Sequence, residues 1–339
     1  MSANSGPFFW SEFLLLPTGR LLTKISRNAF SGRYGYFRAK WRTVTEERIL
    51  FAEANALLAF LRRSGCTFHR CADLYRQPVP RGISYRYDVH VRDIPGCRSF
   101  VEFHRKEGIP ATFFFFWDYS PLERKHFQEY KDLRKLIAEP SDVGHHDSPV
   151  DAFLIANRFR GNRREYATWA DSEGAVRWLT RLAEDPVELA RFNDSVLTEF
   201  IARVRQAQVH FGPISLIAGH GGELGQLLRK KLPKMKPAAA DIARNLRARY
   251  WLTPNRLAAA GLDACVDRND HSPEGWFEAS DDGGLITKMA RLLRRRLDQS
   301  TAVQLLLHPY TWAGGKRDAE LSELLNSGAA VSPVGALAK

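Results

Sequence analysis

The most regular feature of the hydrophobic pattern is a set of short apolar runs, each followed within a few residues by glycine or proline. They cover residues 83–91, 111–117, 214–218 and 302–307. The first run is rich in β-branched and aromatic residues, a composition typical of strands. The second is almost continuously apolar, which is typical of a strand buried on both faces in a parallel α/β sheet. We therefore predict strands over all four segments.

Helical patterns separate these strands. Ser99 and Glu102 have the spacing of a capping box, which predicts a helix from there to about Glu107, with Gly108 as its left-handed stop. A second helix is predicted over about residues 122–138. Strands that alternate with helices in this way are typical of α/β proteins with a parallel sheet.

We predict one α/β domain, a distorted (β/α)-barrel with about seven parallel strands, over residues 43–325. The chain has 339 residues, a length at which barrels often form a single domain. Residues 1–42, rich in arginine and aromatic side chains, are predicted to form an N-terminal extension. Residues 151–209 are mostly helical and exposed by pattern, which predicts a helical insertion. Residues 326–339 are predicted to be a loose C-terminal tail.

Side chains able to bind a metal stand at the end of the first strand. Asp88 and His90 are two residues apart, so they point to the same face of that strand. A carboxylate beside an imidazole begins a divalent-metal site or an acid–base pair. For this pair alone, an isolated Asp and an isolated His satisfied by backbone groups explain the pattern equally well.

Three further segments carry histidine. A predicted loop over residues 141–149 contains His145 and His146, while His220 and His308 each end a predicted strand. A single histidine after a strand is more often structural. Four strand ends that each carry a His or an Asp, however, are how a parallel α/β barrel builds an active site on one face. We therefore favour a functional site.

The order of these segments is itself informative. Residues 86–90 (RYDVH), 108–115 (GIPATFFF), 143–146 (VGHH) and 305–309 (LLLHP) resemble successive motifs of the polysaccharide deacetylase (NodB-homology) superfamily. The similarity is to a divergent branch linked to surface-polysaccharide and O-antigen biosynthesis, and it extends in order over residues 45–315. The resemblance implies a metal-dependent deacylase, a C–N amide hydrolase acting on an amino sugar or a surface-polysaccharide precursor.

Two departures from the family pattern concern the metal ligands. His90 stands where the branch has a second Asp; a histidine there is still a metal ligand, with a softer preference. The family's H-x-x-x-H pair is missing, because Val150 stands four residues after His146 and Pro149 four after His145. A ligand must therefore come from elsewhere in the chain, or the metal is bound weakly or not at all.

The resemblance implies a role for each candidate residue. A divalent metal, expected to be zinc, is bound by Asp88, His90 and His146. Asp88 also accepts the proton of water, and His308 protonates the leaving amine. His220 is a ligand or an electrostatic stabiliser of the reaction.

Substrate binding is assigned to two further residues and to charge. Asp267 and Trp312 are expected to shape the sugar pocket. The net charge is +12, with basic clusters at residues 229–236 and 291–296. Solvated helix faces explain such clusters, but so does attraction to a nucleotide- or lipid-linked sugar, an acidic polysaccharide or a membrane surface. No nucleic-acid-binding module accompanies the charge, so nucleic acid is not an expected partner.

The expected location is the cytoplasm. Residues 8–16 are apolar, but they contain Glu12, follow no Lys or Arg and stop at Pro17, which fits neither a signal peptide nor a membrane span. The four cysteines lack C-x-x-C spacing, which indicates reduced thiols.

The sequence lacks the motifs that mark several other enzyme classes. No predicted strand leads into a Walker loop, a G-x-G-x-x-G motif or a G-x-S-x-G elbow, which argues against NTPase, dinucleotide-binding and serine-hydrolase functions. Two alternatives to hydrolysis stay open. The same site can transfer an acyl group to an amine in place of water, or the barrel has lost hydrolysis and binds an acidic glycan.

Overall fold

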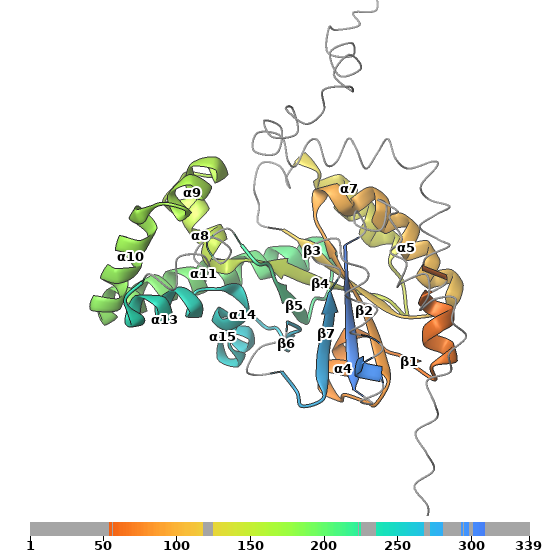
Figure 1. Cartoon of the computed structure of the whole chain (residues 1–339). Coiled ribbons are helices and arrows are strands. Elements are labelled where there is room, and N and C mark those ends of the chain that lie inside the picture. Colours follow the sequence, from red (N-terminus) through yellow and green to blue (C-terminus); the bar gives the residue numbers. More distant parts are fainter. Residues whose placement is uncertain are drawn as a thin grey trace, which may run out of the picture.

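A parallel sheet curled into a half-barrel and surrounded by helices forms the centre of the protein (Figure 1). The predicted α/β fold, a distorted (β/α)-barrel with seven parallel strands along the sheet, is thereby confirmed. The computed structural model describes residues 54–55, 57–117, 125–222, 224, 235–267, 272–280, 293, 295–297 and 301–308.

The seven strands follow the order β6-β5-β4-β3-β2-β8-β7, and all neighbouring pairs are parallel. A short eighth strand, β1 (Thr67–Phe68), pairs with the start of β2. The four segments predicted as strands correspond to β2, β3, β5 and β8. The bounds are β2 Gly82–Val89, β3 Ala111–Phe116, β4 Asp142–Asp147, β5 Leu216–Gly219, β6 Ala264–Cys265, β7 Trp276–Ser280 and β8 Ala302–Leu307.

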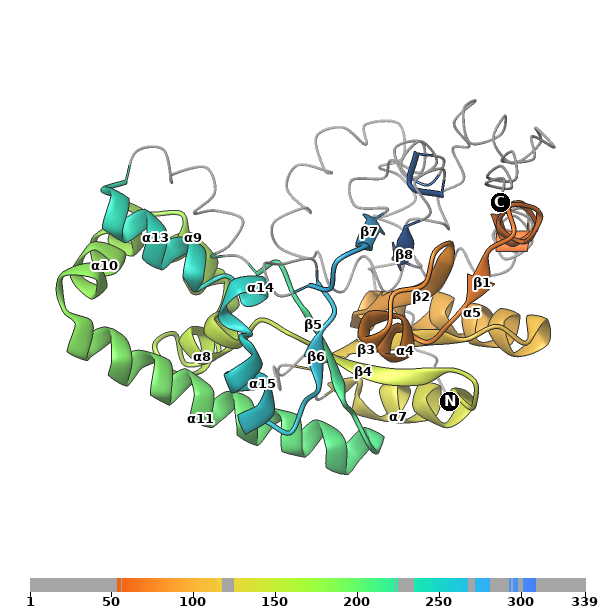
Figure 2. The same cartoon turned by 90° about the horizontal axis from the view of Figure 1, so that it is seen from below.

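Helices connect the strands and extend well beyond the sheet. In Figures 1 and 2, α9, α10 and α13 lie farthest from the strands, on the side opposite α5 and α7. The bounds are α4 Cys71–Arg76, η2 (a 3₁₀ turn) Val91–Asp93, α5 Ile94–Glu107, α7 Phe127–Leu136, α8 Pro149–Asn157, α9 Arg163–Ala170, α10 Glu173–Glu184, α11 Pro186–Phe211, α13 Pro237–Asn245, α14 Ala248–Trp251 and α15 Pro254–Ala259.

Side chains alternate along the strands, so one face of the sheet is apolar and the other holds the residues of the candidate site. In β3, Phe113 stacks on Tyr87 with ring centroids 5.0 Å apart, and Phe115 packs against α7 and α11. Phe114 and Phe116 point the other way, toward an arginine of β2 and toward histidines at the strand ends. The residues that form the candidate site therefore lie on the side away from α5 and α7.

Two local predictions are wrong. Helix α5 begins at Ile94 instead of Ser99, because a proline is compatible with the first helical turn; its end at Gly108, with φ 64°, is confirmed. His145 and His146 lie in strand β4 and not in a loop. This strand is polar, but it pairs with β3 on one side and β5 on the other, so its backbone groups are satisfied.

The segment 151–209 is helical as predicted, and its helices have both exposed and buried faces. It contains α8 to α11, and the long helix α11 buries Val196, Phe200 and Val204 completely. The helices bury these side chains against one another and against the sheet, so the segment belongs to the main hydrophobic core.

Several predictions fall on residues outside those described. They concern Trp312, the N-terminal extension, the C-terminal tail and most of the two basic clusters. Among the helices that the structure describes, none combines the length and the apolar character needed to cross a membrane.

Candidate metal centre

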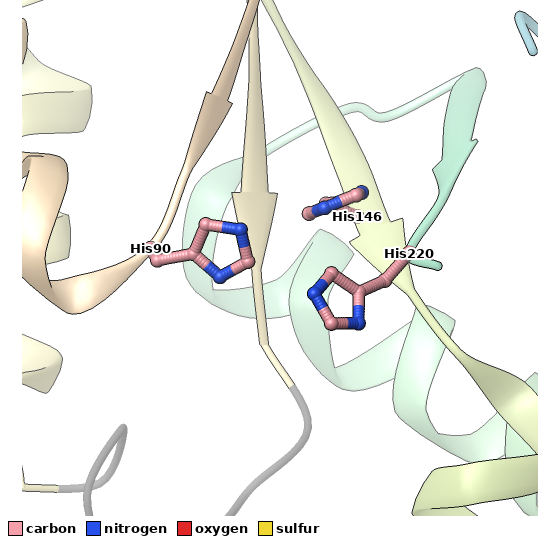
Figure 3. A group of neighbouring side chains, drawn as sticks. All are labelled: His90, His146 and His220. Atoms are coloured by element: carbon pink, nitrogen blue, oxygen red, sulfur yellow. The ribbon is translucent and has the colours of Figure 1, made fainter. Parts of the chain in front are cut away.

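Three histidines from the carboxyl ends of three strands converge at one edge of the sheet (Figure 3). His90 follows β2, His146 belongs to β4 and His220 follows β5. One nitrogen from each ring lies within 4.8 Å of the other two, and the ring centroids are 5.1 to 5.3 Å apart. The predicted ligands His90 and His146 thus lie together, and His220 lies beside them as a third residue that could hold a metal ion.

His146 is oriented as a ligand by its backbone contact. Its Nδ1 donates a hydrogen bond to the carbonyl of Ala218 at 2.9 Å, so the neutral ring keeps a lone pair on Nε2. Burial lowers the pKa of His146, against the opposing charge of Asp88. The imidazole is therefore neutral near pH 7, which is the form that binds metal ions.

His220 is held in a different tautomer. Its Nδ1 accepts a hydrogen bond from the backbone N–H of Gly222 at 3.2 Å, which puts the proton of the neutral ring on Nε2. Burial, together with the charges of His146 and Arg163, lowers the pKa of His220 to about 3. For Nε2 to bind a metal, the proton must move to Nδ1 and the Gly222 contact must break.

The donor set fits a zinc-like divalent ion. In a tetrahedral site with metal–nitrogen bonds near 2.1 Å, ligand atoms lie about 3.4 Å apart. The 4.8 Å limit here is wider, so the rings would have to move inward to hold an ion; His90 and His220 are half-buried, whereas His146 is buried. Three protein ligands leave a fourth position open, as in catalytic rather than structural zinc sites.

Asp88 is bound by Arg86 and is not a member of the histidine group. The Arg86 Nε and Nη2 atoms donate to its two carboxylate oxygens at 2.7 and 2.8 Å, a bidentate pair. Burial by itself raises the pKa of Asp88, but the charges of Arg86 and His146 outweigh it and lower the pKa. Asp88 is thus an ionised carboxylate whose Oδ2 lies 3.6 Å from His146 Nε2.

Arg86 is the hub of a larger buried network, the Arg86 hub, which comprises Arg86, Asp88, Asp267, Glu278 and Gln304. The Nη1 atom of Arg86 donates to Asp267 at 2.8 Å and to Glu278 at 3.0 Å. Gln304 donates to the same Glu278 oxygen at 3.1 Å. Burial raises the pKa of Glu278 to about 7. The predicted sugar residue Asp267 is engaged in this hub and with the Gly219 N–H at 2.6 Å.

His308 lies at the same sheet edge as Asp88. Strands β2 and β8 pair Tyr87 with Leu307, so the next residue of each strand, Asp88 and His308, stand side by side. His308 is buried, and its charge contributes to the lowered pKa of Asp88.

His145, adjacent to His146 in the chain, points to the opposite face of β4. Its Nε2 lies 3.4 Å from an oxygen of Asp147, which also accepts a hydrogen bond from Arg203 at 3.1 Å. Of the two neighbouring histidines, His146 is the one that faces the candidate metal centre.

Three members of the Arg86 hub, namely Arg86, Glu278 and Gln304, were not among the predicted residues. Arg86 is two positions before Asp88, so the alternation that paired Asp88 with His90 was a signal for it as well. Glu278 lies 192 residues from Arg86, and no local pattern marks it.

Comparisons with known proteins add no relative. No family model, curated protein or solved structure matches the chain. The resemblance to polysaccharide deacetylases therefore depends on the motifs and their order.

Proposed function

We propose that this chain is a metal-dependent deacylase that hydrolyses the amide bond of an N-acyl amino sugar. The observation that carries the proposal is the convergence of His90, His146 and His220 next to an arginine-held carboxylate. Such a set of imidazoles with an open position suits a catalytic divalent ion, with zinc the best match. When bound, the ion would polarise the acyl oxygen and lower the pKa of a water from about 16 toward 7.

Two residues of the chain would carry out the proton transfers, Asp88 as the base and His308 as the acid. Asp88 is ionised and is the proposed acceptor of the water proton, with Arg86 fixing the orientation of its carboxylate. His308, at the same sheet edge, is the proposed acid that protonates the leaving amine. Asp88 serves as base rather than ligand in this scheme, because it lies outside the group of three histidines whose nitrogens converge.

The substrate and its setting follow from the resemblance and the charge. We propose an anionic carbohydrate, such as a nucleotide- or lipid-linked amino sugar of surface-polysaccharide or O-antigen biosynthesis, processed in the cytoplasm. The net charge of +12 supports an anionic partner. Binding through such charges weakens as salt rises, since they are screened over about 8 Å at physiological ionic strength.

One observation favours the alternative in which the barrel binds a glycan without hydrolysis. The tautomer of His220 points a proton, and not a lone pair, out of Nε2. If that tautomer persists, only two histidines are left for a metal. The metal content of the protein separates the two functions.

The test is metal analysis of the full chain purified without chelator, together with its His146→Ala and His145→Ala variants. We expect about one zinc per wild-type chain, its loss in His146→Ala, and its retention in His145→Ala, whose ring faces away. Amine release from a panel of N-acyl amino sugars and nucleotide sugars should follow the metal. A wild-type chain that binds no divalent ion, or an undiminished zinc content in His146→Ala, would contradict the proposal.

A further inference from the structure

A groove of about 520 Å³ lies where α8, α9 and α10 meet, in the helical part of the molecule (Figure 1). Phe159 follows α8, Trp169 belongs to α9 and Ser172 caps α10, and all three line the groove. Pockets that bind small molecules have volumes of about 300–1,000 Å³. The groove therefore has room for a ligand the size of a small sugar.

One wall of the groove is aromatic and is held in place by packing. Phe159 is buried, and its ring centroid lies 5.3 Å from that of Trp169, which in turn lies 5.5 Å from that of Trp178. Asn162 and Thr168 add an amide and a hydroxyl to the lining. An apolar wall next to a few groups that form hydrogen bonds suits a sugar, which has both C–H groups and hydroxyls.

The groove carries a net positive charge. Arg158 lies beside it, exposed to solvent, with its guanidinium 4.4 Å from the centroid of the Trp169 ring, and the exposed Arg164 lines it. Among the residues that the structure describes, no acid pairs with either arginine. Glu165, the acid among the described lining residues, is engaged with Asn162, whose amide donates to its carboxylate at 3.3 Å. An arginine stacked on an aromatic ring presents its N–H donors in a fixed fork that matches a carboxylate.

The first turn of α9 lies between the groove and the candidate metal centre. Arg163 lines the small cavity beside His220, while its neighbours Asn162 and Arg164 line the groove. A helix with its side chains is about 10–12 Å across. A chain of a few sugar units can therefore occupy the groove with one end at the histidines.

We propose that the groove binds an acidic sugar unit, a uronate, of an extended glycan whose N-acyl amino sugar lies at the metal centre. The inference rests on the proposed deacylase function and names its substrate class as an acidic oligosaccharide. The uronate carboxylate would accept hydrogen bonds from Arg158 and Arg164, and its ring would lie along the wall formed by Phe159 and Trp169.

The probe is a hyaluronan tetrasaccharide, in which glucuronate alternates with N-acetylglucosamine, together with its methyl ester, which has the same sugars and no charge. Both are titrated into the full chain by calorimetry. We expect the acid to bind about tenfold more tightly than the ester. The double variant Arg158→Gln/Arg164→Gln should bind the acid about tenfold more weakly than the wild type does. The matched control is Arg105→Gln, which removes an exposed arginine of α5 on the opposite side of the sheet and should bind as the wild type does.

The outcomes separate the uronate site from the deacylase. Equal affinity for acid and ester, no binding of either, or an equal loss in Arg105→Gln and the double variant overturns the uronate site and leaves the metal-dependent deacylase standing. Tighter binding of uridine diphosphate than of the tetrasaccharide, lost in the double variant, assigns the groove to a phosphate group and overturns the uronate. A chain that binds no zinc but prefers the acid to the ester overturns the deacylase and keeps the groove as a glycan-binding site. The comparison of acid with ester in the wild type decides the question even if the double variant does not fold.

Discussion

Replacing Glu278 with glutamine changes a carboxylate of the Arg86 hub whose pKa is raised. The Glu278 side chain is 18% exposed, and its Oε2 accepts hydrogen bonds from Arg86 at 3.0 Å and Gln304 at 3.1 Å. Burial raises its pKa from 4.5 to about 7, although the charge of Arg86 opposes the increase. A glutamine carbonyl keeps an acceptor for both donors but does not ionise.

The raised pKa of Glu278 sets the direction and size of the expected change in the free energy of unfolding with pH. Below pH 4.5, Glu278 is protonated in both the folded and unfolded chain, so it causes no difference. Between pH 4.5 and 7 the unfolded chain loses the proton while the folded chain keeps it, and the free energy of unfolding falls as pH rises. At about 1.4 kcal/mol for each pH unit, this interval amounts to about 3 kcal/mol.

The assay is urea denaturation of the wild-type chain and Glu278→Gln at pH 4.5, 5.5, 6.5 and 7.5. The variant should gain about 3 kcal/mol relative to wild type between the lowest and highest pH, with no further gain above pH 8. Glu274→Gln, an exposed glutamate four residues earlier, is the control and should follow the wild type. Parallel curves for wild type and Glu278→Gln would refute a protonated Glu278 in the folded protein.

Two further changes test the hub and the metal centre. Arg86→Lys removes the bidentate contact and leaves buried carboxylates short of donors, so the free energy of unfolding in urea should fall by about 3–5 kcal/mol; a loss below about 1 kcal/mol would show that the hub is dispensable. His220→Ala should lower zinc affinity, measured by chelator competition, by less than His146→Ala does, because only His146 already holds its proton on Nδ1. Equal losses would contradict that assignment.

The parts of the fold that follow from short-range pattern were predictable. The apolar run of β3 and the alternation in β2 depend on the spacing of neighbouring residues. The alternation placed Asp88 and His90 together at the end of β2, although β2 ends at Val89 and His90 follows it. The shared edge of Asp88 and His308 followed from the expected parallel sheet, and the pairing of Tyr87 with Leu307 confirms it.

The features that could not be predicted depend on distant partners. Strand β4 has the sequence DVGHHD, whose composition favours a loop. It is a strand because β3 and β5 pair with it, and because Ala218 and Arg203 form hydrogen bonds with its buried His146 and Asp147. None of these partners is close in sequence, so no local pattern contains the information.

The presence of His90 where the deacetylase pattern has a second aspartate has an electrostatic consequence for the proposed metal centre. With His90 in place of a second aspartate, the three candidate ligands are all neutral, so a bound divalent ion keeps its full charge of about two. The compensating charge lies next to it in the Arg86 hub, where three carboxylates surround one guanidinium. When all three are ionised, this hub carries a net charge of minus two, and protonation of Glu278 reduces it to minus one. Because the positive ion favours the ionised form of a nearby carboxylate, metal binding and ionisation of Glu278 should support each other. In the proposed metal centre, a charged ligand would be exchanged for a charged neighbour, and Asp88 would remain available as the proposed base.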